Sequence, residues 1–297
     1  PQNGGLQVTP YATLGVTNGG HQGLLGLALS PDFLNDGYVY VQATVPGVDQ
    51  QPDQSVVLRF TDDPINNVAT NQVAVVSGLP VSSINNGGEL VFDLEGHLLV
   101  SIGDNEVPAN AQAPFATSPS GKVLRYDVST VPAGIPATNP DPASPEWCRG
   151  LRNTFGLAVH PSFGTTIGAD NGPTADDEVN LIEAGRNYEW GAVGSVTNQG
   201  RRLVRYSDVI VPTALAWHEG TNLPPEFAHN LLLASYDDQK VRRLLMSGPT
   251  FADYDDEVDF MEFALEADDN KPLDLFVIPD GSIWVVTFTG IWRVAPF

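Results

Sequence analysis

The stretch GLALSPDFLNDGYVYV at residues 26–41 decides the fold. It holds two short apolar runs that flank a Pro-Asp turn, and neither run keeps a helical period. Apolar runs of this length, bounded by turn residues, are typical of buried β-strands. The same pattern recurs along the chain as ELVFDLEGHLLVSI (89–102), GLAVHPSFGTTIGA (156–169), NLLLASYDDQKVRRLL (230–245) and LFVIPDGSIWVV (275–286).

The spacing of these copies predicts the architecture. They lie roughly 40 to 60 residues apart, as expected for β-propeller blades of four antiparallel strands. Dividing the 297 residues by roughly 49 residues per blade predicts a six-bladed β-propeller, with five or seven blades as alternatives. We expect a single all-β domain over 1–297, in which the segment from Leu6 to Leu14 pairs with Ile283–Val294 and closes the ring. A β-sandwich joined to a second domain is the structural alternative, although nothing between the copies resembles an interdomain linker.

The charge balance excludes several classes of partner. The chain carries 14 Lys and Arg against 36 Asp and Glu, a formal net charge of −22, and its only lysines are Lys122, Lys240 and Lys271. Nucleic acids and anionic membrane surfaces both require clustered positive charge, so we expect neither as a partner. No apolar run reaches 18 residues, and we therefore expect no membrane span.

The cysteine content and the start of the chain give two further expectations, one about cross-links and metal clusters and one about location. The single cysteine, Cys148, excludes an intramolecular disulfide and a Cys-rich metal cluster, and a partly buried apolar role is expected for it. Because the chain begins at Pro1 without a signal segment, we expect a processed product of a periplasmic or secreted protein.

The densest acidic cluster is ADNGPTADDEVNLIE at 169–183. Ca²⁺ takes six to eight oxygen ligands from carboxylates and turn carbonyls, and a Gly-Pro turn followed by three acids offers both. No EF-hand pattern is present, and three adjacent acids are more often a solvated turn. From composition alone the solvated turn is favoured over a calcium site.

Two further loops carry polar groups that suit a ligand. WCRGLRNTFGL at 147–157 places two arginines and an amide before a strand, in a chain where cations are scarce. Arginine binds carboxylates through its planar fork, although charge compensation by ion pairs is the alternative. SINNGGE at 83–89 contains an Asn-Gly turn that by itself is an ordinary loop before a strand. Of the five scattered histidines, His21 lies in a Gly-rich loop before the first strand, and no two show metal-ligand spacing.

Taken together, these loops resemble the soluble, quinoprotein-type glucose/sorbosone dehydrogenase family. The resemblance implies a six-bladed propeller that oxidises aldoses with pyrroloquinoline quinone (PQQ) and Ca²⁺. The segments that carry it are GLLGLALSPDF (23–33), GGELVF (87–92), IGD (102–104), GKVLR (121–125), RNTFGLA (152–158), the acidic cluster and NYEWG (187–191).

The resemblance assigns roles to particular residues. Arg152 and Asn153 match the pair that contacts the quinone and substrate, and Asp104 matches the acid that orients the catalytic histidine. For the calcium site the resemblance reverses the preference for a solvated turn. The calcium ligands it implies are Gly172, Pro173, Asp177, Glu178 and Tyr188.

The sequence departs from the family pattern at several of these positions. Asn85 stands where the family has its histidine base, and an amide does not take a proton near neutral pH, which removes a typical 10²–10⁴-fold contribution. Asp237 stands at the position of a cofactor-binding lysine, and Lys271 and Leu273 match positions that are basic in the family. Replacing a cation by Asp237 disfavours the three carboxylates of PQQ. His21 is a candidate replacement base, with a simple loop role as the alternative.

Two functions therefore follow. The first is a PQQ-dependent aldose dehydrogenase that oxidises a sugar at C1 to the lactone, with His21 or a water replacing the missing base. The second is a calcium-stabilised propeller without redox activity that binds a glycan or another protein, as a module of a larger extracellular protein.

Overall fold

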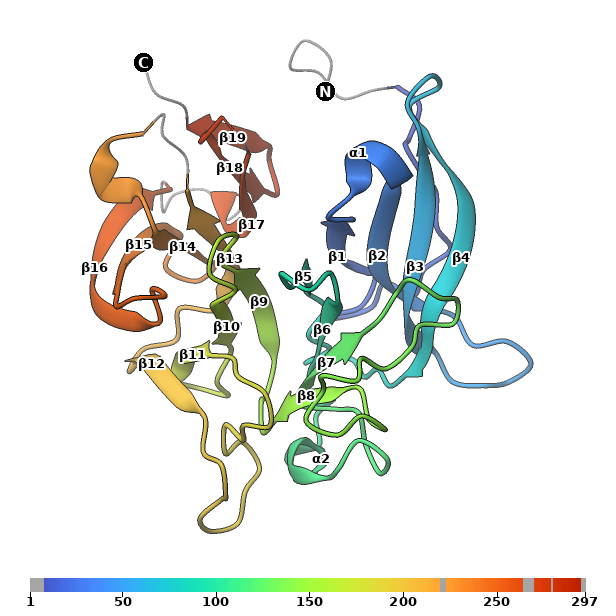
Figure 1. Ribbon diagram of the computed structural model, residues 1–297, viewed down its shortest axis with the longest axis horizontal. Coiled ribbons are helices and arrows are strands. Elements are labelled where there is room, and N and C mark those ends of the chain that lie inside the picture. Colours follow the sequence, from blue (N-terminus) through green and yellow to red (C-terminus); the bar gives the residue numbers. More distant parts are fainter. Residues whose placement is uncertain (1–7, 220–222, 264–269, 279, 295–297) are drawn as a thin grey trace.

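The chain is built almost entirely of β-strands in five antiparallel sheets that follow one another around an arc (Figure 1). The structure is a computed structural model that describes residues 8–219, 223–263, 270–278 and 280–294. The inner strands β1, β5, β9, β13 and β17 contact one another in that order. Each sheet runs outward from its inner strand in consecutive order.

Four sheets have four strands and the fifth has three among the described residues. The first sheet is β1 (Leu24–Leu29), β2 (Tyr38–Val45), β3 (Gln54–Asp63) and β4 (Val68–Leu79). The second is β5 (Leu90–Phe92), β6 (Leu98–Ile102), β7 (Lys122–Tyr126) and β8 (Glu146–Arg149). The third is β9 (Thr154–Val159), β10 (Thr166–Asp170), β11 (Asp177–Leu181) and β12 (Arg201–Tyr206). The fourth is β13 (Pro212–His218), β14 (Asn230–Ser235), β15 (Lys240–Ser247) and β16 (Asp253–Glu262), and the fifth is β17 (Pro272–Val277), β18 (Ile283–Thr287) and β19 (Ile291–Val294).

Helices are short and lie in the connections. They are α1 (Phe33–Asp36), α2 (Pro108–Gln112) and the 3₁₀ turn η1 (Pro225–Phe227). Within the part of the chain that the structure describes, no helix has the length and apolar character needed to cross a bilayer.

The second strand of each sheet explains the apolar runs in the sequence. Leu98–Ile102 and Asn230–Ser235 are buried at every position, because each strand lies between neighbouring sheets and has no solvent face. In the sequence, such strands are continuous apolar runs and show no alternation of apolar and polar residues. The hydrophobic core accordingly consists of clusters between successive sheets, centred on residues such as Leu124, Leu151, Leu231 and Val285.

The expected all-β propeller is confirmed, but the prediction of six blades is wrong, because the structure has five. Each copy of the repeated pattern falls in a different sheet, so the copies themselves give the correct number. The first four sheets span 24–79, 90–149, 154–206 and 212–262, and each therefore takes more than the roughly 49 residues used in the division. Long connections, such as the Pro-rich loop before β8, account for the extra residues.

The N-terminal segment lies against the first sheet where it is described. The Ala69 N–H of β4 donates to the Tyr11 carbonyl at 2.8 Å, and the Tyr11 hydroxyl donates to Asp62. Leu14 packs with the apolar side chains of the same sheet. Leu6 lies outside the described residues, and pairing of this segment with Ile283–Val294 stays a prediction.

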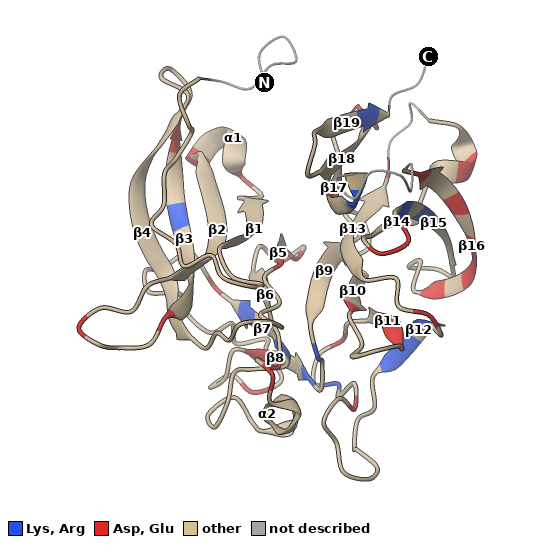
Figure 2. Ribbon diagram, turned by 180° about the vertical axis from the view of Figure 1, so that it is seen from behind, with Lys and Arg blue, Asp and Glu red and all other residues tan. Residues whose placement is uncertain are grey.

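Acidic residues are distributed unevenly over the sheets. Figure 2 shows Asp and Glu concentrated along β16, next to the basic residues of β15. Arg242 pairs with Asp238 and lies 3.5 Å from Glu257, while Lys240 pairs with Asp259 at 2.6 Å. Two of the scarce cations are thus used to hold the edge of the fourth sheet.

Candidate functional site

A cavity of about 450 Å³ lies where all five inner strands begin. Its walls include Leu24 of β1, Gly88 before β5, Phe155 of β9, Thr213 of β13 and Asp274 of β17. We call this end of the strands the cleft face. Some of the predicted catalytic residues come just before an inner strand, and the others come just after the second strand of a sheet. Because these two strands are antiparallel, the start of one and the end of the other lie at the same face.

The 83–89 loop and the end of β6 are held together by glycine contacts. Gly87 has φ +65°, and a Cβ added there would lie 2.8 Å from the Ser101 carbonyl. A Cβ on Gly103 would lie 2.0 Å from the Asn85 carbonyl, closer than any side chain allows. The two glycines therefore permit the approach that places Asn85 beside Asp104.

Asp104 is the centre of the predicted catalytic group. It is 1 % exposed, and its carboxylate accepts hydrogen bonds from Asn85 Nδ2 at 3.0 Å, the Glu106 N–H at 2.9 Å and Trp190 Nε1 at 2.8 Å. Its own N–H donates to the Arg152 carbonyl at 2.7 Å. The acid thus orients the side chain at position 85, as the resemblance implies, although that side chain is an amide.

His21 lies next to Asn85. The Asn85 N–H approaches His21 Nδ1 at 3.4 Å, while the His21 N–H donates to the Ser83 carbonyl and the Asn86 amide donates to the His21 carbonyl, both at 2.7 Å. Partial burial lowers the pKa of His21, and the charge of Arg152 lowers it further. The His21 imidazole therefore lies beside Asn85 with its neutral form favoured by its surroundings.

Arg152 and Asn153 join the same group. Arg152 Nη1 donates to the carbonyls of Asn171 at 2.9 Å and Gly172 at 2.8 Å, and its guanidinium lies 5.6 Å from the Trp190 ring centre. Arg152 Nε is buried without a hydrogen-bond partner. Asn153 Oδ1 accepts the Gly87 N–H at 3.0 Å and so connects the loop before β9 to the loop before β5.

The two predicted cofactor contacts in the later sheets lie next to each other. Lys271 Nζ is 3.8 Å from Asp237 and 4.3 Å from the centre of the Tyr236 ring. The negative charge of Asp237 therefore offsets the positive charge of Lys271. This reduces the attraction that Lys271 can offer to an anionic cofactor.

The side chains predicted to bind calcium do not converge on a common point. Asp177 is 1 % exposed, and its carboxylate accepts the N–H groups of Gly172 at 2.7 Å and of Ile210 and Val211 at 2.8 Å. Glu178 pairs with Arg202 at 2.8 Å, and burial raises the pKa of Glu178.

The other predicted ligands have different surroundings. The Tyr188 hydroxyl donates to the Leu181 carbonyl inside the core, and burial raises its pKa. Pro173 is exposed in the turn, and the Gly172 carbonyl accepts Arg152. These side chains do not fit a calcium ion held by carboxylates, and the Gly172 carbonyl becomes available only if Arg152 releases it.

Sequence reasoning missed three residues of the site. Trp190 donates to Asp104 and lies in the NYEWG segment, in which the resemblance assigns a role only to Tyr188. Glu89 and Asp274 line the cavity of about 450 Å³ at the cleft face. Burial raises the pKa of both, that of Glu89 well above its usual range with a further contribution from Asp274. Only the tertiary structure brings these two carboxyls, distant in sequence, to one cavity.

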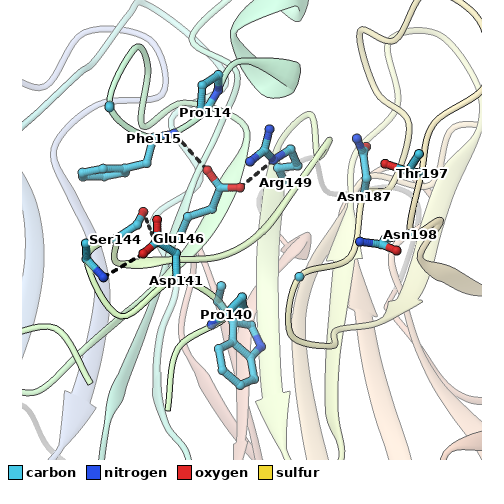
Figure 3. Close-up of a pocket in the computed structure, with 14 residues that line it drawn as sticks. Pro114, Phe115, Pro140, Asp141, Ser144, Glu146, Arg149, Asn187, Thr197 and Asn198 are labelled. Carbon is cyan, nitrogen blue, oxygen red and sulfur yellow. Dashed lines mark hydrogen bonds and ion pairs between the residues drawn. The ribbon is translucent and has the colours of Figure 1, made fainter. Parts of the chain in front are cut away.

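A second cavity, of about 640 Å³, lies between β8, the Pro-rich loop before it and the loop after β11 (Figure 3). Glu146 pairs with Arg149 at 2.5 Å across it and accepts the Phe115 N–H at 2.9 Å. None of the predicted site residues lines this cavity. Its third charged group, Asp141, accepts the Ala143 N–H at 2.9 Å.

The fold and the site define a β-propeller whose cleft face gathers a histidine, an arginine and a buried aspartate. The glucose/sorbosone dehydrogenase family model matches residues 2–290, and the chain belongs to this family. The expected resemblance is thereby confirmed.

Known relatives agree with this assignment. The chain is 32 % identical over 213 residues to quinoprotein glucose dehydrogenase B of Acinetobacter calcoaceticus, covering 63 % of this chain and 44 % of the relative. It is 31 % identical over 175 residues to an aldose sugar dehydrogenase of Escherichia coli K12, covering 58 % and 46 %. The matched part therefore spans about half the length of these relatives.

A solved structure extends the comparison to the fold. The PQQ-bound aldose sugar dehydrogenase from Streptomyces coelicolor superposes with a TM-score of 0.74 at 26 % identity, over 92 % of this chain and 76 % of that one.

Proposed function

We propose that this chain oxidises an aldose at its anomeric carbon with PQQ, at the cleft face, where the loops that carry His21, Asp104 and Arg152 meet. One observation carries the proposal: the His21 imidazole, whose pKa is lowered by partial burial and by Arg152, lies beside Asn85, the residue that the resemblance aligns with the family's base. The substrate class is supported by membership of a family of sugar dehydrogenases.

The residues present fit a PQQ group on one side of the cleft. Arg152 Nε is a buried donor without a partner, and a buried unpaired donor is costly unless a ligand acceptor satisfies it. We assign Arg152 and Asn153 to the quinone oxygens. Lys271, paired with Asp237, contributes a weaker contact.

The mechanism follows from the positions of the chain's own groups. PQQ, when bound, supplies the two-electron acceptor that takes the hydride from the sugar C1. His21 Nδ1 takes the proton of the C1 hydroxyl, because its lone pair is engaged only by the long 3.4 Å contact with the Asn85 N–H. Asp104, held by Trp190, fixes the Asn85 side chain and so the wall of the cleft. The product is the lactone.

Calcium enters the proposal only through main-chain oxygens. The carboxylates of Asp177 and Glu178 are already paired, so a bound cation would depend on main-chain oxygens such as the Gly172 carbonyl, which also accepts a hydrogen bond from Arg152. No catalytic step is assigned to this ion.

Reconstitution tests the proposal. The chain is incubated with PQQ and Ca²⁺, and dye reduction is followed with a panel of aldoses. We expect turnover in the native chain and a 10²–10⁴-fold lower kcat in His21→Ala. His97→Ala is the matched control, because His97 lies at the β5–β6 turn beside Asp93 and Glu95. Absence of both PQQ binding and turnover contradicts the proposal, and equal loss in the two variants contradicts the role of His21.

A glycan- or protein-binding propeller without redox activity is the second candidate. The pairing of Asp237 with Lys271 favours it, because it removes a cation from the cofactor side. Binding of an aldose or glycan by a chain that does not bind PQQ supports this candidate. A secreted or periplasmic location and a single closed domain remain predictions under either function.

A further inference from the structure

Three side chains from two neighbouring sheets meet at the end of the strands opposite the cleft face. His160 follows β9 of the third sheet, Glu219 follows β13 of the fourth, and His229 precedes β14. Because His218 pairs with Asn230, Glu219 and His229 lie at the same end of their hairpin. The six residues of β9 separate His160 from Arg152 and Asn153, a distance of about 20 Å at about 3.3 Å per residue. The group is therefore distinct from the candidate active site.

The distances suit a common ligand. Glu219 Oε1 lies 3.0 Å from His160 Nε2 and 2.7 Å from His229 Nδ1. One ligand atom from each residue lies within 4.8 Å of the other two. His160 is 0 % exposed, yet its Nε2 makes no hydrogen bond of acceptable geometry. A buried ring nitrogen that lies beside a carboxylate without a well-oriented hydrogen bond needs an explanation. The His160 ring also stacks on the ring of His229, with ring centres 5.6 Å apart.

We propose that His160, Glu219 and His229 bind a zinc ion that links the third and fourth sheets. Two imidazoles and a carboxylate are ligands that Zn²⁺ prefers, with a water or solvent molecule in the fourth position. At about 2.1 Å from the ion, tetrahedral ligand atoms stand about 3.4 Å apart, so each ring nitrogen needs to move away from Glu219 Oε1 by less than about 1 Å. The two nitrogens, which lie within 4.8 Å of each other, would take the same spacing. His229, the more exposed ligand, leaves a side open to solvent.

Coordination has one identifiable cost. The Ser162 N–H donates to His160 Nδ1 at 3.2 Å, which places the ring proton on Nε2 in the metal-free state. Zinc on Nε2 requires that proton on Nδ1, so this contact must open. Ser162 lies in an exposed turn, where its N–H can turn to water. The proton stays on the ring, so the cost is limited to the lost Ser162 contact and the change of tautomer.

Aromatic rings hold the two imidazoles in place. Phe251 stacks on His229 with ring centres 4.2 Å apart and an angle of 16°. His160 contacts Phe163 at 4.9 Å and Trp217 at 4.7 Å. An apolar shell of this kind orients metal ligands and limits access of water. The rings therefore fix the positions of two of the three proposed ligands.

Zinc titration of the chelator-treated chain tests the proposal. We expect one Zn²⁺ per chain by calorimetry at micromolar protein, and the visible absorption of four-coordinate Co²⁺ when cobalt replaces zinc. We also expect a higher Tm with zinc, since an ion that binds only the folded chain stabilises it by mass action.

Variants locate the ion. Glu219→Gln and His229→Ala should each weaken zinc binding by at least 100-fold, whereas His97→Ala should leave it unchanged. His229 is partly exposed, so its variant is expected to fold even if changes at buried His160 are not tolerated. No zinc uptake by the native chain overturns the proposal, and so does uptake that both cluster variants retain. Neither outcome bears on PQQ or dye reduction, because the two sites lie at opposite ends of the strands.

Discussion

Replacing Asp177 by Asn separates two roles for this carboxylate, that of a calcium ligand and that of a cap for the main chain. Asp177 accepts three N–H groups, from Gly172, Ile210 and Val211, and is 1 % exposed. Val211 has φ +52°, an unfavourable conformation for a β-branched residue, and its N–H is one of the three donors. The carboxylate therefore holds a strained segment in place.

The structure sets the size of the effect. An asparagine keeps one acceptor oxygen and presents an NH₂ group to the remaining donor, so one buried N–H loses its partner at about 1–3 kcal/mol. The other two bonds lose their ionic character, at about 1 kcal/mol each. We expect the free energy of unfolding to fall by about 3–5 kcal/mol.

The measurement is urea unfolding followed by tryptophan fluorescence in the presence of a chelator. Asp176→Asn is the matched control, because the side chain of this adjacent acid is exposed and pairs with Arg205 on the surface, where ion pairs contribute little to stability. If Asp177→Asn is as stable as Asp176→Asn in chelator and loses stability only relative to the calcium-loaded native chain, the cap assignment is refuted and the ligand assignment gains support.

Three further outcomes follow from burial. Burial raises the pKa of Asp170 from 3.8 to about 7, so the folded chain binds this proton more tightly than the unfolded chain. The stability that this proton contributes is fully present below pH 4 and is lost as the pH rises through 7. The free energy of unfolding of the native chain should therefore fall over this pH range, and that of Asp170→Asn should not. Parallel curves for the two chains contradict the prediction. Burial raises the pKa of the Cys148 thiol to about 12, so a thiol reagent at pH 8 should label it only after unfolding, and rapid labelling of the native chain contradicts its placement. Leu231→Ala at 0 % exposure should cost about 2–5 kcal/mol in denaturant unfolding, against little for fully exposed Val193→Ala, and equal effects contradict the core assignment.

The sequence predicted the class of fold because its strands are buried between sheets. The run at 98–102 and its counterparts are apolar at almost every position, which is the pattern that the structure requires of strands without a solvent face. The predicted number of blades was wrong because it was obtained from an average blade length. The long connections before β8 and after β11 lie within single sheets and make those blades longer than the average.

The candidate site was only partly predictable. Asp104, Arg152 and Asn153 lie in motifs that the resemblance identifies, and the structure brings them together with His21 and Asn85. The predicted calcium ligands have no such common point, because a sequence of acids does not reveal whether each carboxylate faces a cation or a main-chain N–H.

By itself, the sequence determined the β-propeller class, the family and the identity of the polar groups at the ends of the strands, because periodicity and local motifs are properties of short segments. Tertiary structure alone decided the number of sheets, the pairing of Asp237 with Lys271, and the meeting of His160, Glu219 and His229. Each of these depends on which strand ends face one another across neighbouring sheets. That arrangement is set by packing between segments tens of residues apart, which no local pattern records.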